Sequence, residues 1–161
     1  MDTFWLLSLK FAFLEAEMTI VIAESARVSM LADIEKSLRG TRIVVGAHSV
    51  IDSFVKIKAA GGIGDLYIGE HVVINSGCVL YTGGGISIGN HVAVAANCTF
   101  APVNHAYKDK SHPICEQGFW PGKGTILRRG CVLGAGSAVR SELAAYTVYA
   151  GQPLRVVGER Q

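Results

Sequence analysis

His105 is the residue whose type and position most clearly suggest chemistry. From Ile68 to Phe100 an aliphatic or aromatic residue recurs every six positions, with one eight-residue step across three glycines. His105 lies five residues after Phe100, where this regular spacing stops. A neutral imidazole, with an unperturbed pKa of about 6.5, accepts a proton near neutral pH and can pass it on. A residue of this type can therefore act in proton transfer, and the alternative is a loop histidine with no catalytic task.

The six-residue spacing extends through most of the chain. Neither an amphipathic helix nor an alternating strand has this period, whereas a hexapeptide solenoid does. The repeating residues fall into five triplets, and every departure from six follows the third member of a triplet. The triplets are Ile22, Val28, Ile34; Val45, Ile51, Ile57; Ile68, Ile74, Leu80; Ile88, Val94, Phe100; and Leu127, Leu133, Val139.

Each triplet predicts one triangular coil, in which every hexapeptide supplies a short strand and a corner. Insertions of 5, 5, 2 and 21 residues then leave the solenoid from the same corner. Loops that leave there do not disturb the backbone hydrogen bonds between coils. The position four residues after each repeating residue is mostly small or β-branched, as a tight interior corner requires. These residues are Ala26, Ala32, Ser49, Val55, Val72, Cys78, Val92, Cys98, Cys131 and Ser137.

Composition limits the class of protein. Half of the 161 residues are hydrophobic, which suits one compact domain or solenoid. Fifteen basic and thirteen acidic residues give a net charge of +2, so nothing indicates a nucleic-acid partner. The four cysteines accompany a large apolar content and do not indicate a disulfide framework. We therefore expect a protein of the reducing cytoplasm.

The N-terminal residues 1–17 are apolar but are interrupted by Lys10. They fall far short of the ~20 residues of a membrane span, and no basic region of a cleaved signal peptide precedes them. Their large apolar residues recur at helical spacing and predict a short helix that covers the open end of the solenoid. A weak contact with a membrane surface is the alternative. The residues at this spacing are Phe4, Leu7, Phe11 and Leu14.

Four motifs accompany the repeats in a fixed order. They are TFAPVNHAYKD around His105, HPICEQGF after it, PGKG at 121–124, and VLGAGSAVRSELAAYTVYAGQPLRVV near the end. Together they resemble the hexapeptide-repeat acyltransferases, over the span from about Ile20 to Arg160, and in particular the branch that O-acetylates sugars and surface polysaccharides. The resemblance implies an all-β solenoid, a left-handed parallel β-helix of about five triangular coils with a short N-terminal helix and one long loop. The left-handed sense comes from the resemblance, because most parallel crossovers are right-handed.

This resemblance divides the chain into three parts. Residues 1–19 are expected to form the N-terminal capping segment, 20–144 the β-helix with an extruded loop at 106–122, and 145–161 a C-terminal tail. Similar proteins are homotrimers whose active sites lie between neighbouring subunits. We therefore expect a trimer here.

The activity that the resemblance implies is an acetyl-CoA-dependent O-acetyltransferase acting on a saccharide hydroxyl, in surface polysaccharide biosynthesis. Similar enzymes transfer the acetyl group directly, without an acyl-enzyme, and use the histidine at the position of His105 as general base. An alcohol needs such a base because it is a poor nucleophile until its proton is drawn off. No metal is expected.

Similar enzymes also suggest residues that bind the acceptor. Asn75 matches an asparagine that touches the sugar, and its amide can pair with hydroxyl groups. The alternative is a turn asparagine that caps its own corner. Gln117 and Trp120 lie in the long loop and suit hydrogen bonding to a sugar and stacking on its ring. Packing on a neighbouring subunit is the alternative for Trp120.

Four residues match positions that contact coenzyme A in similar enzymes. Ala135 belongs to the GAGS motif, Arg140 and Ser141 follow it, and Arg155 lies near the C-terminus. Backbone groups at a coil edge bond the pantetheine amides, and basic side chains bind the phosphates. The alternative for both arginines is an ordinary solvated surface.

One departure from the family pattern concerns the cofactor groove. Similar enzymes usually carry a further coil, with a D-x-W-I-G type motif, between the KG motif and the GAGS motif. Here Gly124 leads almost directly to Leu127, so about one coil is absent. Loss of a whole coil preserves the register, because the next coil docks one layer lower. It could shorten the groove for coenzyme A.

Other side chains leave two rival functions open. His48, His71 and His91 occupy equivalent corner positions and predict a vertical stack at about 4.8 Å spacing. Since γ-class carbonic anhydrases share this fold and bind zinc through histidines, a zinc enzyme is one rival, although stacked turn residues diverge toward water. A binding module that has lost a coil is the other. Cys78 and Cys98 also occupy equivalent corners, where small buried residues are expected.

Overall fold

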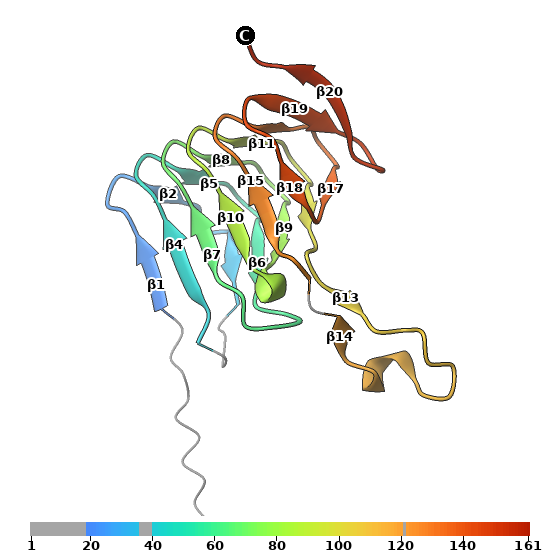
Figure 1. The fold of residues 1–161 in the computed structure, drawn as a ribbon. Coiled ribbons are helices and arrows are strands. Elements are labelled where there is room, and N and C mark those ends of the chain that lie inside the picture. The colour runs from blue at the N-terminus through green and yellow to red at the C-terminus, as the bar shows by residue number, and fades with distance from the viewer. Residues whose placement is uncertain (1–18, 36–39, 121) are drawn as a thin grey trace, which may run out of the picture.

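The computed structural model describes residues 19–35, 40–120 and 122–161. Short strands follow one another around a triangular solenoid, and each coil lies against the next (Figure 1). Helical structure in the described residues is limited to two single 3-10 turns, η1 (Thr82–Gly84) and η2 (Ile114–Glu116). The predicted all-β solenoid is confirmed.

Three sheets form the sides of the solenoid, and all their strand pairs are parallel except that of β19 with β20. The first sheet contains β1 (Thr19–Ile22), β4 (Arg42–Val45), β7 (Leu66–Ile68), β10 (Ile86–Ile88), β15 (Thr125–Leu127) and β18 (Glu142–Leu143). The second contains β2 (Arg27–Val28), β5 (Val50–Ile51), β8 (Val73–Ile74), β11 (Ala93–Val94), β16 (Val132–Leu133), β19 (Thr147–Ala150) and β20 (Arg155–Glu159). The third contains β3 (Asp33–Ile34), β6 (Lys56–Lys58), β9 (Val79–Tyr81), β12 (Thr99–Phe100) and β17 (Ala138–Val139).

The repeating residues align between coils as the sequence predicts. In the third sheet, for example, Ile57 pairs with Leu80, Leu80 with Phe100, and Phe100 with Val139. From the second coil onward, the side chains of all repeating residues point inward and are at most 2 % exposed. The core is therefore a column of aliphatic side chains with Phe100 in it, and the predicted register is confirmed.

The predicted corners are also confirmed. All four insertions run from a strand of the third sheet to a strand of the first, linking β3 to β4, β6 to β7, β9 to β10 and β12 to β15. We call this edge the insertion corner. The small residues at the other corners are buried in every coil but the first, where Ala26 and Ala32 are half-buried.

The stack is continuous across the longest insertion. Strand β15 pairs directly with β10, so residues 101–124 leave and return without a gap in the first sheet. This confirms that the register survives the apparent absence of a coil. Beyond Val139, β18 and β19 add a further layer to the first and second sheets, and β20 turns back antiparallel onto β19.

The opposite end of the solenoid is open in the described part of the chain. Ile20 and Ile22 of β1 hold inward positions but are 41 % and 42 % exposed. The helix predicted within residues 1–17 lies outside the described residues, so the prediction stands as made. None of the helical segments in the described ranges has the length and hydropathy of a membrane span.

Substitution of a repeating residue should cost far more stability than substitution of its neighbour. We expect Phe100→Ala to lower the free energy of unfolding by about 3–5 kcal/mol, because it opens a cavity among the inward side chains. Thr99→Ala, one position along on the outer face, should cost less than about 1 kcal/mol. Urea unfolding followed by circular dichroism measures both, and equal losses would contradict the assigned faces.

Candidate functional site

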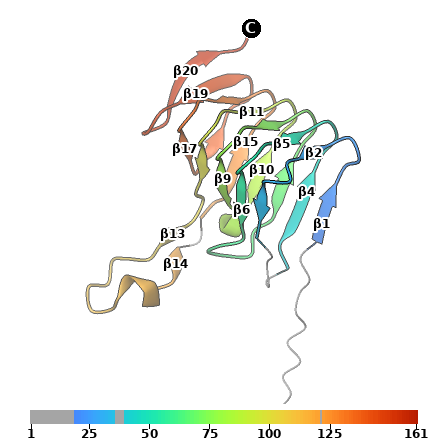
Figure 2. The same cartoon turned by 180° about the vertical axis from the view of Figure 1, so that it is seen from behind.

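The long loop leaves the insertion corner through a small antiparallel ribbon, β13 (Asn104–His105) and β14 (Phe119–Trp120). Both views show this ribbon and the loop beyond it projecting away from the coils (Figures 1 and 2). His105 lies opposite Phe119, and Asn104 lies opposite Trp120. Directly opposite residues share a face of an antiparallel pair. The ribbon therefore presents His105 on one face and Trp120 on the other.

The His105 side chain is exposed and lies against Phe119. The two ring centroids are 4.4 Å apart, with the planes inclined by 36°. The imidazole is thus outside the core, where a proton-transfer role requires it to be.

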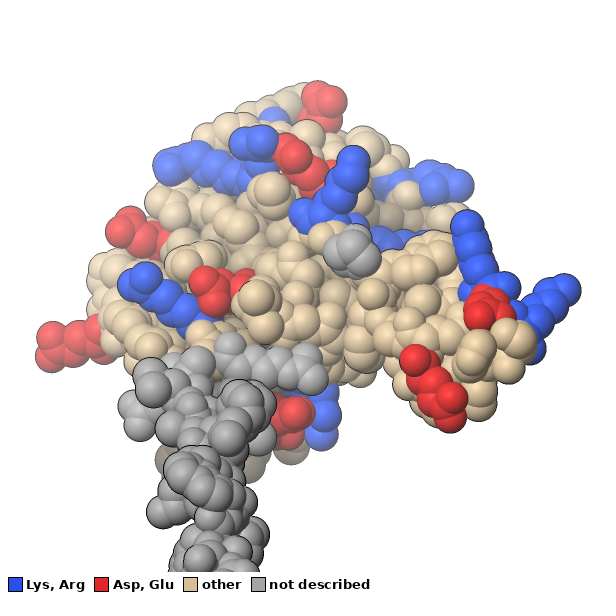
Figure 3. Space-filling model, turned by 60° about the horizontal axis from the view of Figure 1, so that its bottom comes forward, with Lys and Arg blue, Asp and Glu red and all other residues tan. Residues whose placement is uncertain are grey.

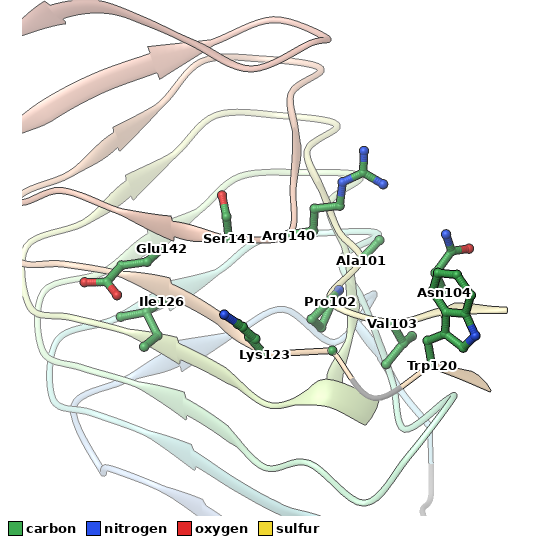
Figure 4. A pocket seen from close by; sticks show the side chains of 12 residues that line it. Ala101, Pro102, Val103, Asn104, Trp120, Lys123, Ile126, Arg140, Ser141 and Glu142 are labelled. Carbon is green, nitrogen blue, oxygen red and sulfur yellow. The ribbon is translucent and has the colours of Figure 1, made fainter. Parts of the chain in front are cut away.

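The opposite face of the ribbon borders a cavity of about 390 Å³ (Figure 4). Asn104 and Trp120 stand side by side at one end, and Ile126 and Glu142 lie at the other. The wall comes from the start of the long loop, its return into β15, and the connection from β17 to β18. The lining residues are Ala101, Pro102, Val103, Asn104, Trp120, Gly122, Lys123, Gly124, Ile126, Arg140, Ser141 and Glu142.

The charges around this cavity favour an anionic ligand. Arg128 donates to Glu142 across 2.5 Å and thereby neutralises the carboxylate of the lining. No carboxylate of the described residues pairs with Lys123 or Arg140. Five of the eight arginines lie beyond residue 127. In the space-filling view, basic side chains predominate in the upper half of the molecule (Figure 3).

A second cavity, of about 450 Å³, adjoins the first along the third sheet. The two share Ala101, Arg140 and Ser141 in their linings. The second extends past β17 to Gln152, Pro153 and Leu154. Together they form an extended groove from the ribbon toward the C-terminal strands, with Arg140 at its middle.

The structure gathers only some of the predicted cofactor residues. Arg140 and Ser141 line the groove together with Trp120. Ala135 is exposed on the turn between β16 and β17 and lines neither cavity. Arg155 lies on β20, where its Nη1 donates to the carbonyl of Leu154, and it also lies outside both linings.

The predicted acceptor residues are separated as well. The Nδ2 of Asn75 donates to the carbonyl of Val94 in the next coil, at 2.8 Å. Gln117 acts within its loop, where its Nε2 donates to the carbonyls of Asp109 and His112 and its Oε1 accepts from the Asp109 N–H. Both amides therefore have local partners that an acceptor would have to displace.

Trp120 packs against its own loop on one side. The ammonium of Lys108 lies 4.9 Å from the centroid of its ring, and the ring of Tyr107 lies 5.4 Å away. The indole still has 39 % of its surface exposed and lines the cavity. Of the three predicted acceptor residues, Trp120 is the one that borders the groove.

The corner histidines form the predicted stack, at the corner between the first and second sheets. Ring centroids are 4.8 Å apart between His48 and His71 and 5.2 Å apart between His71 and His91. All three residues have positive φ angles, between 53° and 60°, which histidine tolerates better than most residues. Within the described residues, no three His, Cys, Asp or Glu side chains converge as metal ligands.

Cys78 and Cys98 are buried at equivalent corners one coil apart, as predicted, and both are free thiols. A hydrogen bond with Cys98, together with burial, raises the pKa of Cys78. Burial raises the pKa of Cys131 to about 11. Cys78 and Cys131 therefore remain protonated and fill the core.

Lys123 is the main site residue that the sequence reasoning missed. It belongs to the PGKG motif, which marked the return of the chain into the coils and received no chemical role. The signal was a lysine beside two glycines at the end of a long insertion. Glu142 and Asn104 also line the cavity without having been predicted.

Comparison with known proteins places the chain among acyltransferase folds. No protein-family model matches it. A probable acetyltransferase of Mycobacterium tuberculosis is 33 % identical over 115 residues, which cover 61 % of this chain. The chain spans only 38 % of the length of that relative.

Solved structures share the architecture at low sequence identity. AntD, an N-acyltransferase from Bacillus cereus in complex with dTDP-4-amino-4,6-dideoxyglucose and coenzyme A, is 20 % identical with a TM-score of 0.66, covering 90 % of this chain and 86 % of its own. The polysialic acid-specific acetyltransferase NeuO is 16 % identical, also with a TM-score of 0.66, and the match covers 87 % of this chain and 61 % of NeuO. A maltose O-acetyltransferase from Clostridium difficile is 18 % identical with a TM-score of 0.55, and the match covers 88 % of this chain and 69 % of that enzyme. The resemblance to hexapeptide-repeat acyltransferases and the left-handed parallel β-helix are confirmed.

Removal of the Gln117 amide should loosen the loop. We expect Gln117→Ala to speed hydrogen exchange of the loop amides, that of Asp109 above all, because three hydrogen bonds are lost. Gln117→Glu keeps an acceptor for the Asp109 N–H and should have a smaller effect. Hydrogen exchange read by mass spectrometry makes the comparison, with the amides of β11 as an internal reference. Unchanged exchange together with a raised KM for the acceptor would instead assign Gln117 to acceptor binding.

Proposed function

We propose that this protein is an acyl-CoA-dependent acetyltransferase that moves an acetyl group to a hydroxyl of a saccharide, with His105 as general base. The observation that carries the proposal is the groove at the insertion corner, beside the ribbon that exposes His105, whose Lys123 and Arg140 pair with no carboxylate of the described residues. The shared fold supports it, since AntD is an N-acyltransferase in complex with a sugar nucleotide and coenzyme A, and NeuO is a polysialic acid-specific acetyltransferase. Because AntD is an N-acyltransferase, an amino sugar is the alternative acceptor.

The groove suits the shape and charge of coenzyme A. Lys123 and Arg140 bind phosphate oxygens through charge-assisted hydrogen bonds. Ser141 offers a hydroxyl to the same ligand, and the length of the groove along β17 accommodates an extended pantetheine arm. Ala135 and Arg155, which lie outside the two cavities, contact the donor only if it extends beyond them.

The chemistry requires one proton carrier. The saccharide hydroxyl donates its proton to the neutral imidazole of His105 as its oxygen attacks the thioester carbonyl carbon. The tetrahedral intermediate collapses, the carbon–sulfur bond breaks, and the imidazolium returns the proton to the departing thiolate. The products are the acetyl ester and free coenzyme A, without an acyl-enzyme.

Two subunits complete each active site in this proposal. Within one chain, the ribbon separates His105 from the groove, so the imidazole needs a groove on a neighbouring subunit. A homotrimer supplies this arrangement. The outer face of the second sheet offers a contact surface, because aligned strands place one row of small apolar side chains there. The row is Val50, Val73, Ala93, Val132 and Val148.

The proposed base is tested by substitution. With labelled acetyl-CoA and a panel of saccharides and amino sugars, we expect His105→Ala to lower kcat at least 100-fold, since general base catalysis contributes about 10²–10⁴. His91→Ala, a matched control in the corner stack, should keep the wild-type rate. Transfer that is equally fast in both variants would refute the assigned base, and binding of coenzyme A without any transfer would favour a binding module.

Mixed oligomers test the shared site. At an acetyl-CoA concentration well below the wild-type Kd, where sites lacking Arg140 are mostly empty, trimers refolded from equal amounts of His105→Ala and Arg140→Ala chains should contain about a quarter of intact sites if each site draws on two subunits. No activity beyond that of the separate variants would place both residues in one subunit's site.

Binding of the donor depends on the two cations. We expect Lys123→Ala and Arg140→Ala each to raise the Kd for coenzyme A about tenfold, because each removes a charge-assisted contact with phosphate. The effect should shrink at high ionic strength. Isothermal titration calorimetry measures it, with Lys56→Ala on the far part of the third sheet as control. Equal affinities for coenzyme A in all three variants would show that coenzyme A does not bind in this groove.

A further inference from the structure

We propose that Phe119 is a positioning residue for His105, and that the loop between β6 and β7 holds Phe119 in place. The proposal rests on the proposed function in one respect, that His105 is the base. It adds Phe119 and the loop between β6 and β7 to the parts of the protein that orient the imidazole.

The first step is the contact between the two rings. Phe119 lies directly across the ribbon from His105, so backbone pairing brings the side chains to the same face. Their centroids are 4.4 Å apart in a tilted arrangement, which is a favourable geometry for aromatic rings. No hydrogen bond from a described residue holds the imidazole of His105. Among the described residues, the Phe119 ring is therefore a neighbour that can restrict its rotation.

The second step is what supports Phe119. The loop between β6 and β7 carries Gly61, with a φ of +80°, against the base of the ribbon. A Cβ at Gly61 would lie 2.8 Å from Cγ2 of Val103 and 3.4 Å from Cδ1 of Phe119. The loop thus approaches both strands of the ribbon closely, and a glycine is needed at the point of contact.

The third step is what fixes that loop to the coils. Gly62 packs its backbone onto that of Gly83 in the next insertion, where an added Cβ would lie 2.1 Å from the Gly83 carbonyl oxygen. Gly61, Gly62, Gly83 and Phe119 together line a groove of about 350 Å³ at this corner. A continuous series of contacts therefore runs from the solenoid through Gly62 and Gly61 to Phe119 and the imidazole.

The position of Phe119 explains why an aromatic residue with half of its surface in water is useful there. Its ring is 45 % exposed, so it contributes little to a core. It lies close both to the imidazole of His105 and to Gly61 of the loop between β6 and β7. An aliphatic residue of similar size would fill the space but would present no flat surface to the His105 ring.

Catalysis by Phe119 variants supplies one test. We expect Phe119→Ala to lower kcat about tenfold while the KM for acetyl-CoA stays unchanged, because Phe119 orients the base without touching the donor. Phe119→Tyr keeps the ring and should restore most of the rate, whereas Phe119→Leu should not. Equal rates in the alanine and tyrosine variants would overturn the proposal. Thermal unfolding of each variant separates lost positioning from lost folding.

A spectroscopic signature tests the contact independently of activity. In protein labelled at the Cε1 of histidine, the His105 resonance should carry a ring-current shift that disappears in Phe119→Leu and returns in Phe119→Tyr. His105→Ala assigns the resonance, and the other histidines should not move. A resonance unchanged by Phe119→Leu would overturn the proposal.

The same variants distinguish failure of the proposed function from failure of the positioning role. If His105→Ala retains full transfer while the His105 resonance still responds to Phe119, the contact exists but has no catalytic meaning, and the positioning role is overturned together with the base. If His105→Ala abolishes transfer and Phe119→Ala does not reduce kcat, the base stands and the positioning role alone is overturned.

Discussion

The parallel hydrogen-bonded ladder between successive coils is the constraint on which the rest of the structure depends. Each inner strand of the three sheets has its backbone groups paired with the coils on either side, so extra residues cannot enter a face without breaking those bonds. All four insertions leave instead at one corner. The ribbon with His105, the groove with Lys123 and Arg140, and the glycine contact under Phe119 are all at this corner because the ladder excludes them from the faces.

The sequence predicted this framework because inward positions impose a simple requirement. Ile57, Leu80 and Phe100 repeat at the third position of their coils since each must fill the same interior space. Corner residues such as Cys78 follow from the same requirement. Polar side chains in the long loop obey no such period. The amide of Gln117 is occupied by Asp109 and His112, and nothing in its spacing indicates those partners.

The site was predictable in its residue types but not in its grouping. Arg140 and Ser141 follow β17 directly, so their place on the insertion corner followed from the register. The face on which His105 lies depends on its pairing with Phe119 across a ribbon whose strands are far apart in the sequence. Lys123 enters the cavity because the chain returns to β15 at that point. Ala135 matches a family position, yet it is exposed on its turn and lines neither cavity.

Because the insertions share one corner, the stability of the coils is separate from ligand recognition by the loops. Changes in loop length there alter closure entropy by only about 0.6 kcal/mol per doubling, while the coils that carry the stability remain untouched. The aliphatic column and the recognition loops can therefore diverge at different rates in descendants of this chain. A family built on such a scaffold is free to acquire new ligands by lengthening or trimming a loop, with no need to redesign its interior.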